Sequence, residues 1–155
     1  MVKVLRESFN RVFASDIHDY GYPLDGIVDF LNVNSNLIRT DFVITNPPYR
    51  LSEEFALKSL EIAKEGVALL VKTTFLETIG RYERLFTVHP PTTCYIFAER
   101  VGMAKDRLDP NISSVTSYSW LFWDKKNMTG QTQLKWIAPS KKRLTKIGDY
   151  DNPSV

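Results

Sequence analysis

The segment Asp41-Phe42-Val43-Ile44-Thr45-Asn46-Pro47-Pro48-Tyr49 decides the fold that the sequence predicts. Its first five residues are mostly apolar or β-branched, which is typical of a buried strand. Two consecutive prolines then end the strand abruptly, because neither can donate a backbone hydrogen bond to a neighbouring strand. We therefore expect a strand over 41–45 that delivers the Asn-Pro-Pro-Tyr segment to the carboxyl edge of a sheet.

Apolar patterning before this segment predicts a helix and then two short extended stretches. A helical period covers 1–9, a short strand over 11–15 ends at Asp16, and a brief apolar stretch with Asp29 near its end follows at 26–31.

The segments after the Pro-Pro pair predict the rest of the sheet. Ser52 is expected to cap a helix that Gly66 ends, and 67–71 is a continuous apolar run of the kind found in strands covered on both faces. The capping-box spacing of Thr74 and Glu77 predicts another helix. Further extended segments are expected at 94–98, at 115–123, where aromatic alternation favours an antiparallel strand, and at 133–137.

Strands separated by helices of this length indicate βαβ units. The sequence therefore predicts an α/β, Rossmann-like fold: a mostly parallel sheet flanked by helices, with an antiparallel last strand. We expect one domain over 1–137 and a basic C-terminal tail over 138–155. Residues 125–155 hold seven Lys or Arg against two Asp, although the whole chain is only +2. Phosphate contact and simple solubilisation are alternatives for the basic residues Lys141, Lys142, Arg143 and Lys146.

The composition is that of an ordinary globular protein, with 43% hydrophobic and 25% charged residues among 155. No apolar run approaches the roughly 20 residues that span a bilayer, and no signal-like leader opens the chain. We therefore expect a cytoplasmic protein without membrane contact. Cys94 is the only cysteine, and His18 and His89 lack acidic neighbours at a metal-ligand spacing. The sequence thus predicts neither a disulfide nor a metal site.

Each residue of Asn46-Pro47-Pro48-Tyr49 has its own chemical reason to be there. Methyl transfer to an exocyclic amine is difficult because the nitrogen lone pair is delocalised into the aromatic ring. The Asn46 side-chain oxygen and the Pro47 carbonyl can each accept a hydrogen bond from an NH2 group and localise that pair. The prolines, Pro48 included, hold the acceptors rigid, and Tyr49 offers a face for a flipped-out base. An ordinary turn is the alternative, but the position beyond a strand's carboxyl end favours a ligand site.

The segment 41–49 resembles motif IV of the class I, S-adenosylmethionine-dependent amino-methyltransferases, above all the DNA adenine-N6 enzymes. The resemblance covers roughly 1–125 and implies S-adenosylmethionine as cofactor, adenine N6 as methyl acceptor and DNA as partner. It also implies that Asp16 binds the cofactor ribose, that Ile17 packs on its adenine, and that Asp29 and the backbone N–H of Phe30 bind the adenine edge. Taken alone, either aspartate could equally be a turn residue.

The glycine-rich loop that this family uses to hold the methionine moiety has no counterpart in the chain, whose seven glycines include no Gly-x-Gly pair. The helix at 1–9 resembles the one that follows that loop, so the resemblance implies a sheet without its central strand. Exposed ladder groups at such a gap would be costly. We therefore expect a homodimer partner, another chain or a rearranged segment to cover it.

This departure leaves three hypotheses open. The first is an active adenine-N6 methyltransferase whose polypeptide extends upstream. The second is a remnant that no longer binds cofactor and serves as a nucleic-acid-binding or interaction module. The third keeps the chemistry but acts on a protein glutamine or on guanine N2 of ribosomal RNA, although Tyr49 fits adenine or glutamine better than guanine. The chain has no substrate-recognition domain, so we expect low sequence specificity or specificity supplied by short loops or elsewhere.

Two further groups of residues could contact nucleic acid. Arg81 and Arg84 could face phosphates or be solvated helix charges. Aromatic residues of the 115–123 segment could stack on bases, although such a strand more often belongs to a core or an interface. They are Tyr118, Trp120, Phe122 and Trp123.

Overall fold

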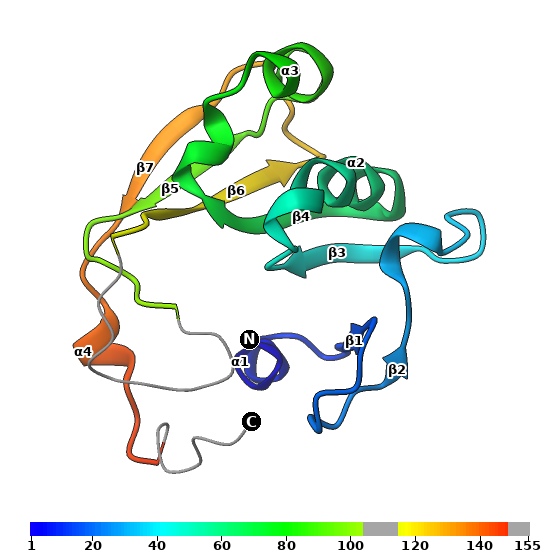
Figure 1. The fold of residues 1–155 in the computed structure, drawn as a ribbon, viewed down its shortest axis with the longest axis vertical. Helices are drawn as coiled ribbons and strands as arrows, with labels where there is room; N and C mark the ends of the chain where they lie inside the picture. Colours follow the sequence, from blue (N-terminus) through cyan, green and yellow to red (C-terminus); the bar gives the residue numbers. More distant parts are fainter. Residues whose placement is uncertain (104–114, 149–155) are drawn as a thin grey trace.

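The computed structural model of the chain describes residues 1–103 and 115–148 and divides their strands between two sheets (Figure 1). The strands are β1 Ser15–Asp16, β2 Gly26–Ile27, β3 Thr40–Thr45, β4 Ala63–Lys72, β5 Thr93–Phe97, β6 Tyr118–Asp124 and β7 Gln133–Ile137. The helical elements are α1 Val2–Ser8, η1 Phe30–Asn32, η2 Tyr49–Leu51, α2 Ser52–Ile62, η3 Thr73–Leu76, α3 Ile79–Arg81, η4 Tyr82–Phe86 and α4 Lys141–Leu144. In this part of the chain, no helix has the length and apolar character needed to cross a membrane.

The larger sheet has the strand order β3-β4-β6-β5-β7 and confirms the α/β class. The pairs β3–β4 and β5–β7 are parallel, whereas β6 pairs antiparallel with both β4 and β5. The prediction of a mostly parallel sheet is therefore wrong: the sheet is mixed, because β6 lies inside it instead of at its margin. The strand at 115–123 is antiparallel as expected, but the last strand of the chain is β7.

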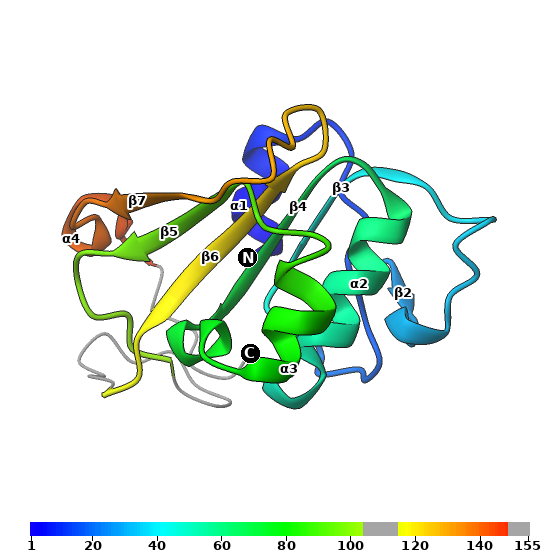
Figure 2. The ribbon, with the colours of Figure 1, turned by 90° about the horizontal axis from the view of Figure 1, so that it is seen from above.

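One face of this sheet carries the hydrophobic core. Residues of β4 that point to the same face pack with Ala56 of α2, Phe75 of η3 and Leu85 of η4, so these helical elements cover one side of the sheet (Figure 2). The buried members of the cluster are Ala56, Ala63, Val67, Leu69, Val71, Phe75, Leu85, Cys94, Leu121 and Trp123. Loops that leave the ends of β3 and β4 are therefore attached to a well-packed platform.

The smaller sheet consists of two residue pairs, Ser15 opposite Gly26 and Asp16 opposite Ile27, in parallel. Among the described residues, no strand joins β1 to β3 (Figure 1). The strand predicted over 11–15 is thus found only at its end, as β1, and the apolar stretch at 26–31 begins with the short strand β2. Because the ladder consists of so few hydrogen bonds, side-chain contacts must help to hold it.

A ring stack and an ion pair are among the contacts that connect this smaller sheet and its neighbours to other elements. The ring of Phe30 in η1 stacks on Phe55 of α2, with ring centroids 5.0 Å apart. An ion pair joins Arg6 of α1 to Asp25 at 3.0 Å, and the same carboxylate accepts a hydrogen bond from the Ala14 backbone N–H at 2.7 Å.

Two predicted helix boundaries are wrong. Ser52 is the first residue of α2, not its N-cap, and its hydroxyl donates to the Pro48 carbonyl at 3.1 Å. The short turn η2 takes the place where a cap was expected. Gly66 lies within β4, since α2 already ends at Ile62. A Cβ at position 66 would lie 2.9 Å from the Phe42 ring, so the glycine serves strand packing and not helix termination.

The helix predicted from Thr74 onwards is also replaced by shorter elements. A 3₁₀ turn, a single α-helical turn and a π-helical turn follow one another between Thr73 and Phe86. Thr74 makes no side-chain cap, because it lies inside η3. Thr78 has poor helix propensity and an extended backbone, which accounts for the break between η3 and α3.

Candidate amine-binding site

The carboxyl ends of β3 and β4 and the first residue of β6 lie at one edge of the larger sheet, because β6 runs antiparallel to its neighbours. This edge brings together the loop after β3, Lys72 at the end of β4 and Tyr118 at the start of β6. The Tyr49 and Tyr118 hydroxyls are 3.1 Å apart, and the Lys72 Nζ lies 4.3 Å from the centre of the Tyr49 ring. Three segments distant in sequence therefore form one site.

The two acceptors predicted for an amine have no protein partner in the described part of the chain. Asn46 is exposed, and neither its side chain nor the Pro47 carbonyl takes part in a hydrogen bond there. The next carbonyl differs, because Pro48 accepts from the Leu51 backbone N–H at 2.9 Å and from the Ser52 hydroxyl at 3.1 Å. The loop is thus anchored through Pro48. The Asn46 side chain stays exposed, whereas Pro47 is a buried residue.

The Asn46 side chain differs from other Asp and Asn side chains of the molecule, which accept hydrogen bonds from the backbone. Five other Asp or Asn side chains accept a hydrogen bond from the backbone N–H two residues later: Asp16, Asp19, Asp29, Asn34 and Asp124. This Asx turn is the commonest local use of such a side chain. Asn46 cannot form it, because the residue two places later is Pro48, which has no N–H. The second proline therefore keeps the Asn46 oxygen available to an external donor.

Tyr49 is fixed at its hydroxyl and on one ring face. Its hydroxyl bonds to Tyr118, while the Lys72 ammonium lies over one side of the ring. Burial, reinforced by the neighbouring Tyr118, raises the pKa of Tyr49 to about 12, so its phenol is neutral at pH 7. The ring is 41% exposed, which leaves surface for a planar ligand. Tyr49 is therefore suited to stacking and not to acting as a base.

The residues expected at the cofactor ribose lie on the small sheet. Asp16 is at the end of β1 with an exposed side chain, and its Oδ1 accepts from the His18 backbone N–H at 3.1 Å. Ile17 is 53% exposed and could pack on an aromatic ring. Both side chains are exposed, and their ribose and adenine roles remain predictions of the resemblance.

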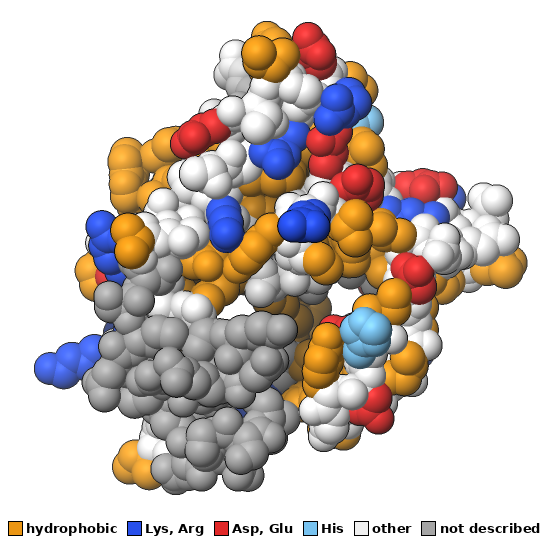
Figure 3. Space-filling view, viewed as in Figure 1, with side chains coloured by type: hydrophobic (Ala, Val, Ile, Leu, Met, Phe, Trp, Pro, Cys, Tyr) orange, Lys and Arg blue, Asp and Glu red, His pale blue; other side chains and the backbone are white. Residues whose placement is uncertain are grey.

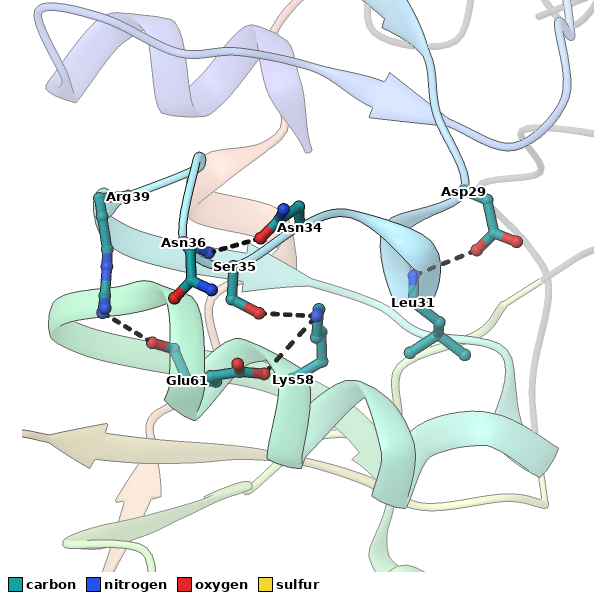
Figure 4. Close-up of polar contacts among 8 residues, drawn as sticks. All are labelled: Asp29, Leu31, Asn34, Ser35, Asn36, Arg39, Lys58 and Glu61. Carbon is teal, nitrogen blue, oxygen red and sulfur yellow. Dashed lines mark hydrogen bonds and ion pairs between the residues drawn. The ribbon is translucent and has the colours of Figure 1, made fainter.

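Asp29 fits its expected role less well. Its Oδ1 accepts from the Leu31 backbone N–H at 3.1 Å, and its Oδ2 accepts from the Asn32 side chain at 2.7 Å. Figure 4 shows this carboxylate turned onto the start of η1, which it caps. The Phe30 ring packs on Phe55.

The following loop is tied to α2 through the bond from Lys58 to Ser35, also drawn in Figure 4. The roles of Asp16, Ile17, Asp29 and Phe30 in cofactor binding remain predictions. Within residues 1–103 and 115–148, no backbone cradle for a methionine moiety accompanies them, so the described residues do not make a complete cofactor site.

Among the remaining sequence candidates, Tyr118 and Arg81 lie near Tyr49 at this edge, and the others lie in the core or elsewhere on the surface. Trp123 and Tyr118 are buried, with Trp120 and Phe122 half-buried, so the aromatic strand is mainly core. In the tail, Lys146 forms an ion pair with Glu7 at 3.0 Å, and the Glu99 carboxylate accepts from backbone N–H groups at the start of α4. No group of three metal-ligating side chains occurs in the segments that the structure describes.

Lys72 lies in the site but was not among the residues predicted from the sequence. It ends an otherwise apolar strand, and a charged residue at that position is a usable signal for a residue at a functional edge. Tyr118 was predicted only as one of four aromatic residues that could stack on bases, because its place beside Tyr49 depends on the antiparallel insertion of β6.

Comparisons with known proteins do not assign the chain to a family. No protein-family model matches it, and no curated protein or solved structure shows significant similarity to it.

Proposed function

We propose that the chain contributes the amine-binding half of an S-adenosylmethionine-dependent methyltransferase that acts on adenine N6 of DNA. The observation that carries the proposal is the exposed Asn46 side chain, whose Oδ1 has no hydrogen-bond partner among the described residues and lies next to the Pro47 carbonyl, on a loop whose prolines remove competing N–H donors. Two acceptors on a rigid loop suit an NH2 group, which offers two hydrogens. Hydrogen bonds from that group would localise the nitrogen lone pair before methyl transfer, and the acceptors would need no reorganisation.

Two features of the fold support the proposal. The antiparallel strand β6 agrees with the antiparallel strand that the methyltransferase resemblance implies. The separate β1–β2 sheet, which carries Asp16 and precedes Asp29, agrees with a fold in which a further strand lies beside β3. S-adenosylmethionine would supply an electrophilic methyl group. The described residues alone do not make a complete site for that cofactor.

A second candidate function has its own supporting observation. Both oxygens of Asp29 are engaged by its own turn, which favours a binding module that holds an amine-bearing base without transferring a methyl group. The two functions predict the same contacts at Asn46 and differ only in cofactor binding.

The deciding experiment combines cofactor titration with product analysis. Calorimetry with S-adenosylmethionine is done on the 155-residue chain and on an upstream-extended product of the same reading frame, and N6-methyladenine formed in DNA is measured by mass spectrometry. We expect binding and methyl transfer from at least one of them. If neither binds the cofactor, the transferase proposal is wrong and the binding module remains.

Asn46→Ala is the matching variant for the amine site. We expect methyl transfer to fall on the order of 10²- to 10³-fold, as when one preorganised polar group is removed from a transition-state site. Cofactor affinity should stay unchanged, and Asn10→Ala, an exposed asparagine elsewhere, should leave both quantities unchanged. Full activity of Asn46→Ala, or loss of cofactor binding with it, would contradict the assigned role.

A further inference from the structure

A second polar site adjoins the amine-binding loop. Six residues line a cavity of about 150 Å³ at the carboxyl edge of the sheet: Tyr49, Ser52, Lys72, Thr74, Phe75 and Arg81. Pockets for drug-sized or nucleoside ligands usually enclose about 300–1,000 Å³. This cavity is too small for such a molecule and suits a compact group. Its lining contains two cations and no carboxylate.

Neutral groups orient both cations without neutralising them. Lys72 Nζ lies 4.3 Å from the Tyr49 ring centre. The Arg81 guanidinium donates to the Phe75 carbonyl at 3.0 Å and lies 4.4 Å from the centre of the Phe75 ring. A π face and a carbonyl hold a cation in place but do not cancel its charge. Arg81 keeps further N–H donors for another acceptor.

Several other basic residues of the molecule have a carboxylate partner. Arg84, only three residues after Arg81, binds both oxygens of Glu53 at 2.6 and 3.0 Å. Arg6 pairs with Asp25, and Lys126 pairs with Glu65. Over residues 1–103 and 115–148, neither Lys72 nor Arg81 has such a partner. Figure 3 shows Lys and Arg side chains on the face that includes α2 and α3.

We propose that Lys72 and Arg81 bind a phosphate of the nucleic acid whose base lies on the Asn46–Tyr49 loop. This proposal rests on the proposed function and names its substrate class. Tyr49 belongs to both sites, so an anion in the cavity lies next to the bound base. Every base of a nucleic acid has backbone phosphates close by, whereas a glutamine side chain of a protein carries no anion. A partly desolvated lysine and arginine recognise phosphate through charge-assisted hydrogen bonds.

Binding of a single-stranded oligodeoxynucleotide tests this inference without any methyl transfer. The probe is a fluorescent thymidine 12-mer with one central adenine, and its affinity for the full chain is measured by anisotropy at several KCl concentrations. We expect Arg81→Gln to weaken binding about 3- to 10-fold and to lower the slope of log affinity against log salt by roughly 0.7, the loss of one phosphate contact on a single strand. Lys72→Gln combined with it should double the change in slope.

The probe and the protein each provide a matched control. Arg84→Gln removes a neighbouring charge that Glu53 already pairs, and it should leave the slope unchanged. Methylphosphonates at the two linkages flanking the adenine should weaken wild-type binding but not binding by the Lys72→Gln, Arg81→Gln double variant. Equal effects of Arg84→Gln and Arg81→Gln, or an unchanged slope in the double variant, would overturn the inference.

Two further outcomes separate this inference from the proposed function. Inorganic phosphate that binds as tightly as the oligonucleotide, with no effect of the methylphosphonates, would show a free-anion site and overturn the nucleic-acid assignment. Oligonucleotide binding that depends on Arg81, in a chain that never methylates DNA, would support the phosphate site and overturn the proposed transfer.

Discussion

Asn46 and Asp29 both follow a strand, and each carries a side-chain oxygen that can accept a hydrogen bond. The oxygens of Asp29 are bound to Leu31 and Asn32, within its own turn, whereas the oxygen of Asn46 is open. The difference comes from the residues that follow, because Asp29 is followed by residues with N–H groups and Asn46 by two prolines. The proline pair, more than the asparagine, therefore keeps the side-chain oxygen available to an external donor.

The strands that precede these two turns also differ, because the strand before Asn46 is held more firmly than the strand before Asp29. β3 pairs with β4 over most of its length, and β4 belongs to the core cluster. β2 pairs with β1 through two residues, and Ile27 in it is 57% exposed. A site on the larger sheet is thus held rigidly, whereas the smaller sheet depends on a few polar contacts. Rigid placement suits acceptors for a reacting amine.

Truncating one aliphatic side chain in each sheet should give the largest difference in stability between the two sheets. Leu69→Ala in β4 removes a fully buried side chain and should lower the free energy of unfolding by about 2–5 kcal/mol. Ile27→Ala in β2 should change it by no more than about 0.5 kcal/mol. Urea unfolding followed by circular dichroism measures both. Similar losses from the two variants would show that the smaller sheet is as tightly packed as the larger one.

Adding a methyl group at a strand glycine gives a smaller, matched test. A Cβ at Gly66 would lie 2.9 Å from Phe42 and 3.1 Å from Phe122, two half-buried rings. Gly66→Ala should therefore cost about 1–3 kcal/mol. At Gly26 the nearest atom is the Phe13 ring at 3.1 Å, and that ring is 71% exposed and can turn away. Gly26→Ala should shift the urea midpoint little, and a shift as large as that of Gly66→Ala would contradict the contrast.

The role of the second proline can be tested directly. Pro48→Ala creates an N–H two residues after Asn46, which can donate to the Asn46 oxygen as in the other Asx turns of the chain. That bond would compete with an amine and reduce transfer or base binding roughly 2- to 10-fold, the worth of one net hydrogen bond. Pro47→Ala is the control, because it also loosens the loop but adds its N–H at the wrong position. Equal losses in the two variants would assign the effect to rigidity alone.

Much of the larger sheet could be predicted from the sequence, because its strands are apolar and bounded by clear breakers. The strand ended by Pro47 and Pro48 was placed within one residue, and β5 and β7 were found. The position of β6 inside the sheet could not be predicted, since residue patterning shows that a strand exists but not which neighbours it takes. The end of α2 was wrongly predicted at Gly66, because a glycine needed for ring packing in a strand cannot be distinguished by sequence from a helix terminator.

The candidate site was predicted in part for similar reasons. Asn46 and Tyr49 belong to one continuous segment, so their chemistry is visible in the sequence. Lys72, Arg81 and Tyr118 reach the site only through the fold, which joins three separate chain segments.

The smallest expected effect concerns Asp25, which links the smaller sheet to α1. The Ala14 backbone N–H, with help from Arg6, lowers the pKa of Asp25 below its usual 3.8. Its carboxylate therefore contributes stability that is fully present above the unfolded pKa of about 3.8 and is lost as the pH falls through the lower folded pKa. The Ala14 amide resonance, followed by NMR from pH 6 to pH 2, should shift with a midpoint below 3.8, while the Leu69 amide in β4 should show no transition there. Asp25→Asn should abolish the Ala14 transition. A midpoint at or above 3.8 would mean that this contact does not hold the smaller sheet, and the contrast between the two sheets would then have to rest on packing alone.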